Sequence, residues 1–329
     1  MRLVMMGTGT FAEPTFEALL ANFPGAVVGL VTQPEREAGS KRGSTRQVGK
    51  GMAEIARAAG CPVLRPESIN SPDGLAALRD LRPDLLVVAA YGQILSKEVL
   101  ATPSRGAINV HASLLPRYRG AAPVAHAILN GERRTGVTII KVTPALDSGD
   151  MLAQEALDIA PDDTTGTLEA RLAVLGARLA VEVVRRYEAG GPVEGVRQDP
   201  ARVTRAPKLG KEFGHIDWEK PADYLERFVR AVQPWPTAYT FLHRPAKEPV
   251  RVIVNRAAGR PARDHEALAR PGEALVRPDR KGFVVRCGGD SVLEPLELQP
   301  AGKKRMTAEE FLRGYPLTAG TRFGPEHLA

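Results

Sequence analysis

The residue types best suited to chemistry lie close together in the segment 107–120. Asn109 and His111 are two positions apart in a run, 107–111, that has the composition of a β-strand. Residues two apart on a strand face the same side, so the amide and the imidazole would lie next to each other. An asparagine amide can donate to a developing oxyanion, and a histidine can exchange a proton near neutral pH. The pair therefore suits a reaction that passes through an oxyanion.

A carboxylate, Asp147, follows the next predicted strand in the sequence 146–150 (LDSGD). If the strand order brings this turn to the end of the sheet where His111 lies, the carboxylate would orient the imidazole and stabilise its charged form. Each residue alone has an ordinary explanation, because a lone histidine is more often structural and Asp-Ser-Gly is a common turn. The prediction of a catalytic site rests on all three residues converging at one sheet edge, where open α/β sheets bind ligands.

Other catalytic patterns do not occur in the sequence. We find no serine-nucleophile elbow, no zinc-binding helix and no phosphate-loop lysine. His126 and His215 have no partners at metal-ligand spacing, and the only cysteines are Cys61 and Cys287. We therefore expect neither a metal site nor a disulfide framework.

The first half of the chain alternates β-rich runs with helical patterns, which predicts an α/β domain built on a parallel sheet. Strands are expected at 2–6, 26–32, 84–91, 107–111 and 137–142. Helices are expected at 14–20, 52–59, 75–78 and 167–187. The sheet would position the catalytic candidates at the ends of its strands.

Residues 7–12 (GTGTFA) form a glycine-containing turn between the first strand and the first helix. The spacing partly matches the dinucleotide-binding pattern, in which glycines let a pyrophosphate approach a helix N-terminus. That pattern also needs an acidic residue at the end of the second strand, where this chain has Thr32, Gln33 and Pro34. A tight strand-to-helix turn is favoured, and a nicotinamide-dependent oxidoreductase is the weaker alternative.

The C-terminal part of the chain has a different pattern. A helix stop at 189–192 (AGGP) is followed by a polar stretch and then by a helix expected at about 222–232. Short strands expected at 238–243, 250–255, 274–277, 283–287 and 292–298 predict a small β-barrel. We therefore predict a catalytic domain at 1–189, a linker at 190–207 and a β-barrel domain at 208–329.

Positive charge is concentrated in the C-terminal part. Residues 205–329 hold 22 Lys and Arg against 16 Asp and Glu, whereas the first 204 residues are nearly neutral. A polar insertion at 33–50 adds five basic residues against two acidic ones. This distribution suits a polyanionic partner, and a merely solvated basic surface is the alternative.

The composition is that of an ordinary soluble protein, with 43% hydrophobic and 25% charged residues. No apolar run approaches the roughly 20 residues that a membrane-spanning helix needs. The first residues lack the apolar core and the cleavage site of a signal peptide. We expect a cytoplasmic protein, and a monomer because no assembly element is visible.

Two motifs together, 109–116 (NVHASLLP) and 147–150 (DSGD), resemble the folate-dependent formyltransferases. Further segments are similar to the members of that family that act on charged initiator tRNA, so the resemblance covers nearly the whole chain. These segments are 7–12 (GTGTFA), 66–69 (PESI), 91–95 (YGQIL), 216–218 (IDW), 230–231 (RA), 234–236 (PWP), 302–306 (GKKRM) and 311–314 (FLRG).

The resemblance implies a Rossmann-like formyltransferase domain followed by an OB-like barrel. The implied reaction moves the formyl group of 10-formyltetrahydrofolate, a co-substrate, to the α-amine of methionyl initiator tRNA, for translation initiation. The implied catalytic residues are Asn109, His111 and Asp147. The residues implied to lie against the folate are Ser113, Leu114, Leu115 and Pro116.

The resemblance also implies where the tRNA binds. The insertion at 33–50 looks like a loop that engages the acceptor end, and the barrel looks like the part that binds the stem. The residues implied to contact tRNA are Arg36, Lys41, Arg42, Lys208, Lys211, Lys303, Lys304 and Arg305. Two positions depart from the pattern: Gly9 stands where these members usually have proline, and 39–43 (GSKRG) differs from their usual glycine-arginine run.

Two further alternatives stay open. An amino-sugar nucleotide N-formyltransferase would use the same catalytic residues, but a small sugar nucleotide requires neither the basic barrel nor the basic insertion. A non-catalytic RNA-binding protein would use the barrel alone, and it leaves the three converging residues without a role.

Overall fold

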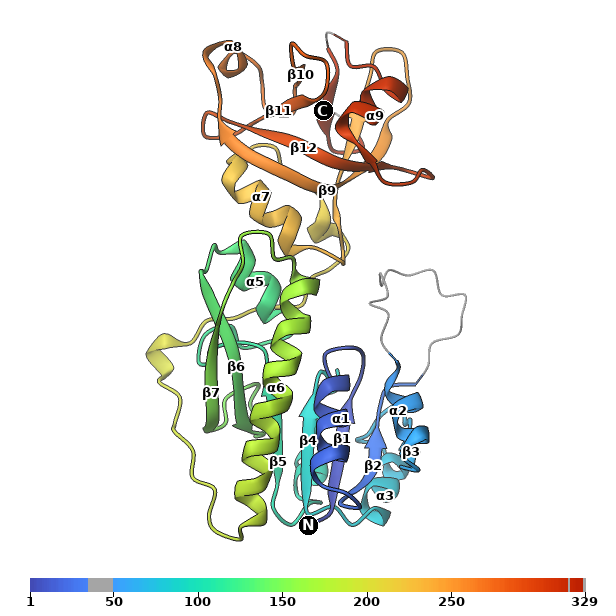
Figure 1. The fold of residues 1–329 in the computed structure, drawn as a ribbon, viewed down its shortest axis with the longest axis vertical. Helices are drawn as coiled ribbons and strands as arrows, with labels where there is room; N and C mark the ends of the chain where they lie inside the picture. The colour runs from blue at the N-terminus through green and yellow to red at the C-terminus, as the bar shows by residue number, and fades with distance from the viewer. Residues whose placement is uncertain (35–49, 319, 328–329) are drawn as a thin grey trace.

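The computed structural model describes residues 1–34, 50–318 and 320–327. An N-terminal α/β domain and a C-terminal β-barrel are stacked along the long axis of the molecule (Figure 1). Arg36, Lys41 and Arg42, which the resemblance implies as tRNA contacts, lie outside the described residues. Among the residues that are described, no helix combines the length and the hydrophobicity needed to cross a bilayer.

The N-terminal domain is built on one sheet with the strand order β3-β2-β1-β4-β5-β6-β7. Strands β3, β2, β1, β4 and β5 are parallel to one another. Strand β6 pairs antiparallel with β5, and β7 pairs antiparallel with β6. The α/β class expected from the sequence is confirmed, although the sheet is not parallel throughout. The strands are β1 (Leu3–Gly7), β2 (Val27–Val31), β3 (Val63–Leu64), β4 (Leu85–Ala89), β5 (Ala107–His111), β6 (Arg134–Lys141) and β7 (Met151–Asp158).

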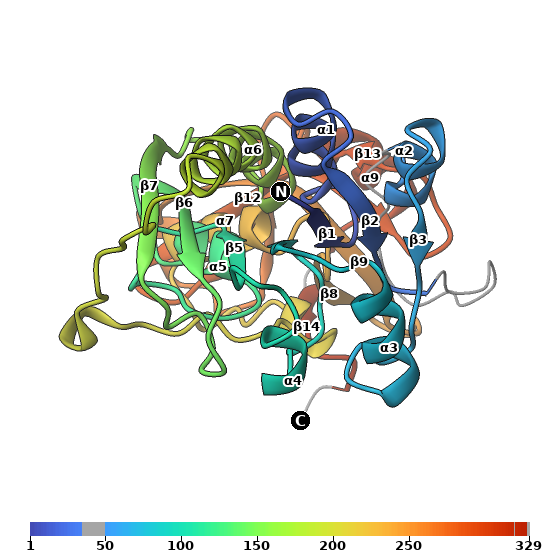
Figure 2. The same ribbon diagram turned by 90° about the horizontal axis from the view of Figure 1, so that it is seen from below.

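Helices cover both faces of this sheet (Figure 2). Successive strand residues point to opposite faces, so Leu3 and Met5 pack under α1 and α6, and Val4 and Met6 pack on the side of α3 and α4. Strands buried on both faces are expected to be apolar throughout, as β1 and β4 are. The helices are α1 (Glu13–Asn22), α2 (Met52–Ala58), α3 (Pro72–Asp80), α4 (Lys97–Leu100), α5 (Pro123–Leu129) and α6 (Thr165–Glu188).

The long helix α6 shows why this sequence forms its elements. Leu168, Leu172 and Leu179 recur at helical spacing and are buried against the sheet. Thr164 precedes the helix, and its hydroxyl accepts a hydrogen bond from the backbone N–H of Thr167 at 3.2 Å. This N-cap satisfies a donor that the first helical turn would otherwise leave unpaired.

The C-terminal domain is an antiparallel barrel with the strand order β10-β11-β12-β9-β8-β14, and β13 pairs with β12. The two end strands approach each other, because Phe323 N donates to Gly272 O at 2.7 Å and Glu273 bridges to Arg322. The barrel predicted from the sequence is therefore confirmed as nearly closed. Its elements are α7 (Ala222–Ala231), β8 (Ala238–His243), β9 (Val250–Pro261), α8 (Asp264–Ala267), β10 (Ala274–Val276), β11 (Phe283–Cys287), β12 (Ser291–Pro300), β13 (Met306–Thr307), α9 (Ala308–Gly314) and β14 (Arg322–Gly324).

The chain between α6 and α7 follows the surface of the N-terminal domain before it reaches the barrel. Val196 exchanges backbone hydrogen bonds with Met151 of β7, and Ala206 N donates to Arg119 O at 2.8 Å. Two short 3₁₀ turns lie in this segment, at Pro200–Arg202 and Glu212–Gly214. The exact domain boundaries stay a prediction, but the segment predicted as a linker is tied to the catalytic domain.

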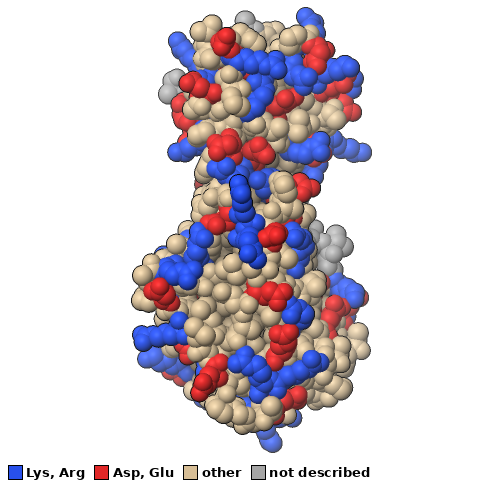
Figure 3. All heavy atoms as spheres, turned by 60° about the vertical axis from the view of Figure 1, so that its left-hand side comes forward, with Lys and Arg blue, Asp and Glu red and all other residues tan. Residues whose placement is uncertain are grey.

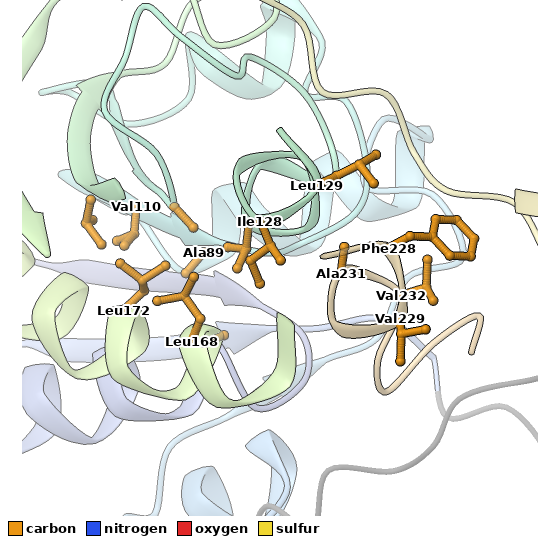
Figure 4. Close-up of a cluster of buried hydrophobic side chains, with 14 of the residues drawn as sticks. Ala89, Val110, Ile128, Leu129, Leu168, Leu172, Phe228, Val229, Ala231 and Val232 are labelled. Carbon is orange, nitrogen blue, oxygen red and sulfur yellow. The ribbon is translucent and has the colours of Figure 1, made fainter. Parts of the chain in front are cut away.

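The two domains share a buried apolar junction (Figure 4). Helix α7 packs against α5, so that Phe228 and Val229 of the barrel domain continue the cluster formed by Ile128, Leu168 and other residues of the N-terminal domain. Hydrogen bonds cross the same junction at the start of α6. Thr165 Oγ1 donates to Ala231 O at 2.6 Å, and Gly166 N donates to Gln233 O at 3.1 Å.

We predict that Ile128→Ala lowers the free energy of unfolding by roughly 2–5 kcal/mol, because Ile128 is 2% exposed and its truncation leaves a cavity in the junction. Chemical denaturation monitored by circular dichroism measures the effect. Val174→Ala, on the exposed face of α6, is the control and should change stability by under about 0.5 kcal/mol. Equal effects of the two substitutions would contradict a shared junction core.

Candidate active site

A cavity of 680 Å³ lies over the carboxyl ends of the central strands of the N-terminal domain. Its wall is made by the turn after β1, the segment after β4, the end of β5, the start of α5 and the loop between β6 and β7. Asn109, His111 and Asp147 all line this cavity. The structure thus brings together the three residues that the sequence singled out.

The imidazole of His111 is held by its surroundings. The side chain is 6% exposed, and its Nε2 lies 3.0 Å from the backbone oxygen of Tyr118. Because a carbonyl oxygen can only accept, Nε2 carries a proton in this contact. The other ring nitrogen, Nδ1, lies 3.7 Å from Oδ2 of Asp147. This contact is longer than a hydrogen bond, so the carboxylate lies close to Nδ1 and leaves that nitrogen open to a ligand in the cavity.

Asp147 reaches His111 by a route that the sequence does not indicate. Strand β6 is antiparallel to β5, and Lys141 at its end pairs with Ile108 near the beginning of β5. The loop that follows must therefore turn back along the sheet for Asp147 to approach His111. The structure brings Asp147 and His111 together, but it does so through this loop and not through the strand order considered in the sequence analysis.

The turn that carries Asp147 is fixed from several sides. Asp147 has a φ of +48°, a conformation that aspartate adopts more readily than most residues, and its Oδ2 accepts the backbone N–H of Gly120 at 2.8 Å. Gly149 packs against the backbone of Lys141, where a Cβ would lie 1.7 Å from the carbonyl oxygen. These contacts hold the turn with its carboxylate facing His111.

A buried glutamine from the segment after α6 supports the same turn. Gln198 is 5% exposed, and its amide nitrogen donates to the backbone oxygens of Asp147 and Gly149, both at 2.8 Å. Its amide oxygen accepts from the guanidinium of Arg119 at 2.8 and 3.0 Å. Sequence reasoning missed this residue because it lies in a polar stretch without a motif. Its role as a support for Asp147 follows only from the fold.

Asn109 has a different environment from His111. It is half-buried on β5 and opposite Ile140 of β6, and it lines the cavity. Within the described part of the chain its side-chain amide has no hydrogen-bond partner. An amide that faces a cavity in this way can donate to a bound oxygen atom.

The four residues implied to contact a folate lie beside the cavity lining and are not part of it. Ser113 is fully buried, and its hydroxyl donates to Arg117 O at 2.7 Å. Leu115 N donates to Thr138 Oγ1 at 3.1 Å, and Leu115 O accepts from Gln154. Leu114 is half-buried and Pro116 is buried. In this structure the four residues form a supporting turn after His111, and a contact between them and a folate stays a prediction.

Apolar side chains stand exposed at the cavity. Ile94 is 78% exposed and Leu146 is 60% exposed, and both line the cavity together with Phe11. Exposed apolar side chains around a concave site are typical of a surface that a ligand covers. The segment 91–95 carries one of the motifs noted in the sequence, but the apolar contribution of Leu146 was not predicted.

Glu169 is a further cavity residue that sequence reasoning missed. It lies on the side of α6 that carries Leu168 and Leu172, where a charged residue interrupts the apolar stripe. Burial raises the pKa of Glu169 to about 7. The sequence could have indicated Glu169 only as a single carboxylate on the side of α6 that otherwise faces the core.

The basic residues predicted to contact tRNA lie in exposed segments. Lys208 and Lys211 precede α7, and Lys303, Lys304 and Arg305 lie between β12 and β13. On the face shown in Figure 3, lysines and arginines of the barrel domain are interspersed with acidic side chains and do not form one continuous patch. Arg305, for example, lies 3.6 Å from Glu297. Among the described residues there is also no cluster of three or more side chains suited to a metal.

Comparison with known proteins assigns both domains. A model of the formyl transferase family matches residues 1–184, and a model of the formyl transferase C-terminal domain matches residues 208–316. The chain belongs to the formyl transferase family. The matches place the cavity with Asn109, His111 and Asp147 in the formyl transferase domain.

Similar members of this family are methionyl-tRNA formyltransferases. The protein from Bacillus licheniformis is 43% identical over 325 residues, which cover 98% of this chain and 98% of that protein. The protein from Acidithiobacillus ferrooxidans is 46% identical over 323 residues, with the same shares of both chains. A solved N-formyltransferase from Helicobacter canadensis, in complex with folinic acid and dTDP-3-aminofucose, has a TM-score of 0.61 at 16% identity. That match covers 90% of this chain and 98% of that one, and it concerns the fold.

We predict that Gln198→Ala lowers the kcat for formyl transfer roughly 10- to 100-fold, because small displacements of a positioned catalytic group cost about that much. The reason is that loss of the two hydrogen bonds frees the Asp147 turn. Steady-state kinetics measure the effect. Arg197→Ala, at the exposed neighbouring position, is the control. If both variants kept the wild-type kcat, Gln198 would have no part in positioning Asp147.

The pKa of Glu169 predicts a dependence of stability on pH. The folded protein keeps the Glu169 proton up to about pH 7, whereas the unfolded chain releases it near pH 4.5. The free energy of unfolding therefore falls between these two pH values, and the cost of ionisation is complete above pH 7. Glu169→Gln removes this titration. Between pH 5 and pH 8 the free energy of unfolding of the variant should therefore fall less than that of the wild type, by about 1–3 kcal/mol.

Denaturant unfolding of both proteins at the two pH values tests this expectation. Glu188→Gln, at the exposed end of α6, is the matched control and should leave the pH dependence unchanged. A wild-type profile that Glu169→Gln does not alter would show that the Glu169 carboxyl titrates as an exposed one does.

Proposed function

We propose that this chain transfers the formyl group of 10-formyltetrahydrofolate to the α-amine of methionyl initiator tRNA. The convergence of Asn109, His111 and Asp147 in one cavity of a formyl transferase domain carries the chemical part of this proposal. The methionyl-tRNA formyltransferases that are 43% and 46% identical over 98% of the chain support the choice of acceptor. The acceptor's place in translation initiation follows from the same assignment.

In the proposed mechanism the acceptor's neutral amine attacks the formyl carbon. A free α-amine has a pKa near ~8, and an adjacent ester lowers it, so a usable fraction is neutral at physiological pH. Attack forms the new C–N bond and places negative charge on the formyl oxygen. The amide of Asn109, which has no partner among the described residues, donates to this oxygen. A protonated His111 adds a charge-assisted hydrogen bond.

Collapse of the tetrahedral intermediate breaks the bond between the formyl carbon and the folate nitrogen. The attacking nitrogen loses its surplus proton, and the leaving folate nitrogen gains one. Asp147 holds His111 at 3.7 Å and keeps the imidazole oriented during this exchange. No metal is needed in this scheme, because the side chains of the cavity supply the hydrogen bonds and the charge.

The folate is proposed to lie along the apolar part of the cavity. Ile94 and Leu146 present exposed side chains there, and a flat ring system would cover them. Ser113, Leu114, Leu115 and Pro116 are proposed to support this ring through the turn that they form beside the cavity.

The tRNA is proposed to contact the barrel through its phosphates. The exposed residues Lys208, Lys211, Lys303, Lys304 and Arg305 are the proposed contacts, together with Arg36, Lys41 and Arg42. Lysine and arginine contacts to phosphates release counterions, so affinity for tRNA should fall as salt concentration rises. Interspersed acidic residues would keep this attraction moderate.

We predict that Asn109→Ala and His111→Ala each lower kcat for formylation of methionyl initiator tRNA roughly 100- to 1000-fold, because each removes one donor to the oxyanion. Product is measured with radiolabelled methionyl-tRNA and 10-formyltetrahydrofolate. His265→Ala, at an exposed position of α8, is the control and should keep the wild-type rate.

The same assay separates the two acceptor classes. The wild-type protein is expected to formylate charged initiator tRNA and not a nucleotide-linked amino sugar. Product with the sugar alone would leave the catalytic residues in place and refute the tRNA acceptor. Near-normal tRNA formylation by His111→Ala would refute the proposed mechanism.

A further inference from the structure

A second hollow, of 720 Å³, lies on the barrel domain, away from the catalytic residues. Three aromatic side chains, Trp235, Tyr239 and Phe241, line it together with Lys211 and Arg251. All three aromatic residues are only half-buried. Aromatic side chains that take no full part in the core and stand beside cations are typical of surfaces on which nucleobases stack.

The hollow follows from the alternation of β8. Ala238, Thr240 and Leu242 point into the barrel and are buried, so Tyr239 and Phe241 between them point outward. Phe241 is opposite Arg251 on β9, and the guanidinium of Arg251 lies 4.1 Å from the centre of the Tyr239 ring. Tyr239 also contacts the rings of His215 and Phe241 edge-on, so the outward side chains form one aromatic cluster on this face of the barrel.

Polar groups in the hollow can recognise the edge of a base. Glu212 and Glu326 line it and are exposed, and carboxylates accept from the exocyclic amino groups of bases. His215 also lines it, and its Nε2 is buried without a partner among the described residues. The hollow thus combines flat apolar rings with acceptors and with cations, as a nucleotide requires.

We propose that this hollow binds an unpaired nucleotide of the acceptor RNA, with the base stacked on Trp235 and Tyr239 and the adjoining phosphates near Lys211 and Arg251. The inference rests on the proposed function for the identity of the RNA, a charged tRNA. A fully paired stem does not fit, because its bases are already stacked on one another and cannot enter between the side chains.

The position of the hollow suits this substrate. Gln233 precedes Pro234, which lines the hollow, and the Gln233 backbone oxygen accepts from Gly166 N at 3.1 Å. Gly166 lies within one helical turn of Glu169, which lines the catalytic cavity. Seen from below, β8 and β14 lie on the same side of the molecule as α4, which follows the cavity segment 91–95 (Figure 2). In the proposal one RNA chain reaches both sites.

One of the predicted basic residues belongs to the hollow. Lys211 lines it directly. The loop that holds Lys303, Lys304 and Arg305 is attached to the same strand, because Ala301 N donates to Arg251 O at 2.9 Å. A phosphate beside a bound nucleotide would meet Lys211 and Arg251, which line the hollow.

Tryptophan fluorescence tests the stacking directly, because the chain has two tryptophans in different environments. Trp218 is 5% exposed and donates to Thr240 inside the barrel, whereas Trp235 lines the hollow. A short single-stranded oligoadenylate should quench the emission of the full-length protein, and a blunt RNA duplex at equal phosphate concentration should not. Trp235→Phe should abolish the quench. Equal quenching by the duplex, or a quench that survives in Trp235→Phe, would overturn the proposal.

Kinetics test the same site with the complete substrate. Trp235→Ala and Tyr239→Ala should each raise the KM for methionyl initiator tRNA roughly 5- to 150-fold, as loss of one stacked base does, with kcat within about twofold of wild type. Leu268→Ala, 88% exposed elsewhere on the barrel, is the control. Unchanged KM values in both aromatic variants would overturn the proposal.

The two experiments separate this inference from the proposed function. The wild type could formylate charged tRNA while RNA causes no quench and the variants show no rise in KM. That result would refute nucleotide binding in the hollow and leave the proposed function intact. A Trp235-dependent quench by single-stranded RNA without any formylation of charged tRNA would refute the proposed function and support the hollow as an RNA site.

Discussion

The candidate active site depends on the way His111 is held between a carbonyl and a carboxylate. The Tyr118 oxygen fixes the proton on Nε2, and Asp147 faces Nδ1 from 3.7 Å. At this distance the carboxylate forms no hydrogen bond with Nδ1, so this nitrogen stays open to a ligand in the cavity. Because the Tyr118 carbonyl holds the ring in place, the cavity keeps a fixed side chain beside Asn109.

Much of the surrounding structure serves to keep the Asp147 turn in place. The loop between β6 and β7 starts near the first residues of β5, whereas His111 is the last residue of that strand. The loop has to fold back over the sheet, so the hydrogen bonds between strands do not hold it. Gln198 and Gly120 supply the missing contacts from segments far away in sequence. Gly120 itself cannot carry a side chain, since a Cβ there would lie 2.5 Å from Ala206 O. The segment after α6 therefore belongs functionally to the catalytic domain.

The sequence predicted the elements that have a strong local signal. The apolar runs of β1 and β4, the stripe of α6 and the short strands of the barrel all follow from periodicity. It did not predict β7, whose residues alternate irregularly because one face is exposed at the sheet edge, or the helix α5. Asn109 and His111 were found because two residues on one strand share a side. Glu169 and Gln198 were not found, because their importance depends on contacts between segments far apart in the chain.

The junction of α7 with α5 and α6 has a consequence for how substrates are chosen. Phe228 and Val229 continue the apolar cluster of the catalytic domain, and Thr165 and Gly166 are hydrogen-bonded to the chain that leaves α7. A seam of this kind resists hinge motion, so the separation between barrel and cavity is set when the chain folds. A long ligand whose two contact points have the matching spacing can then bind the barrel and the cavity together. A ligand that is too short contacts one of them and binds less tightly.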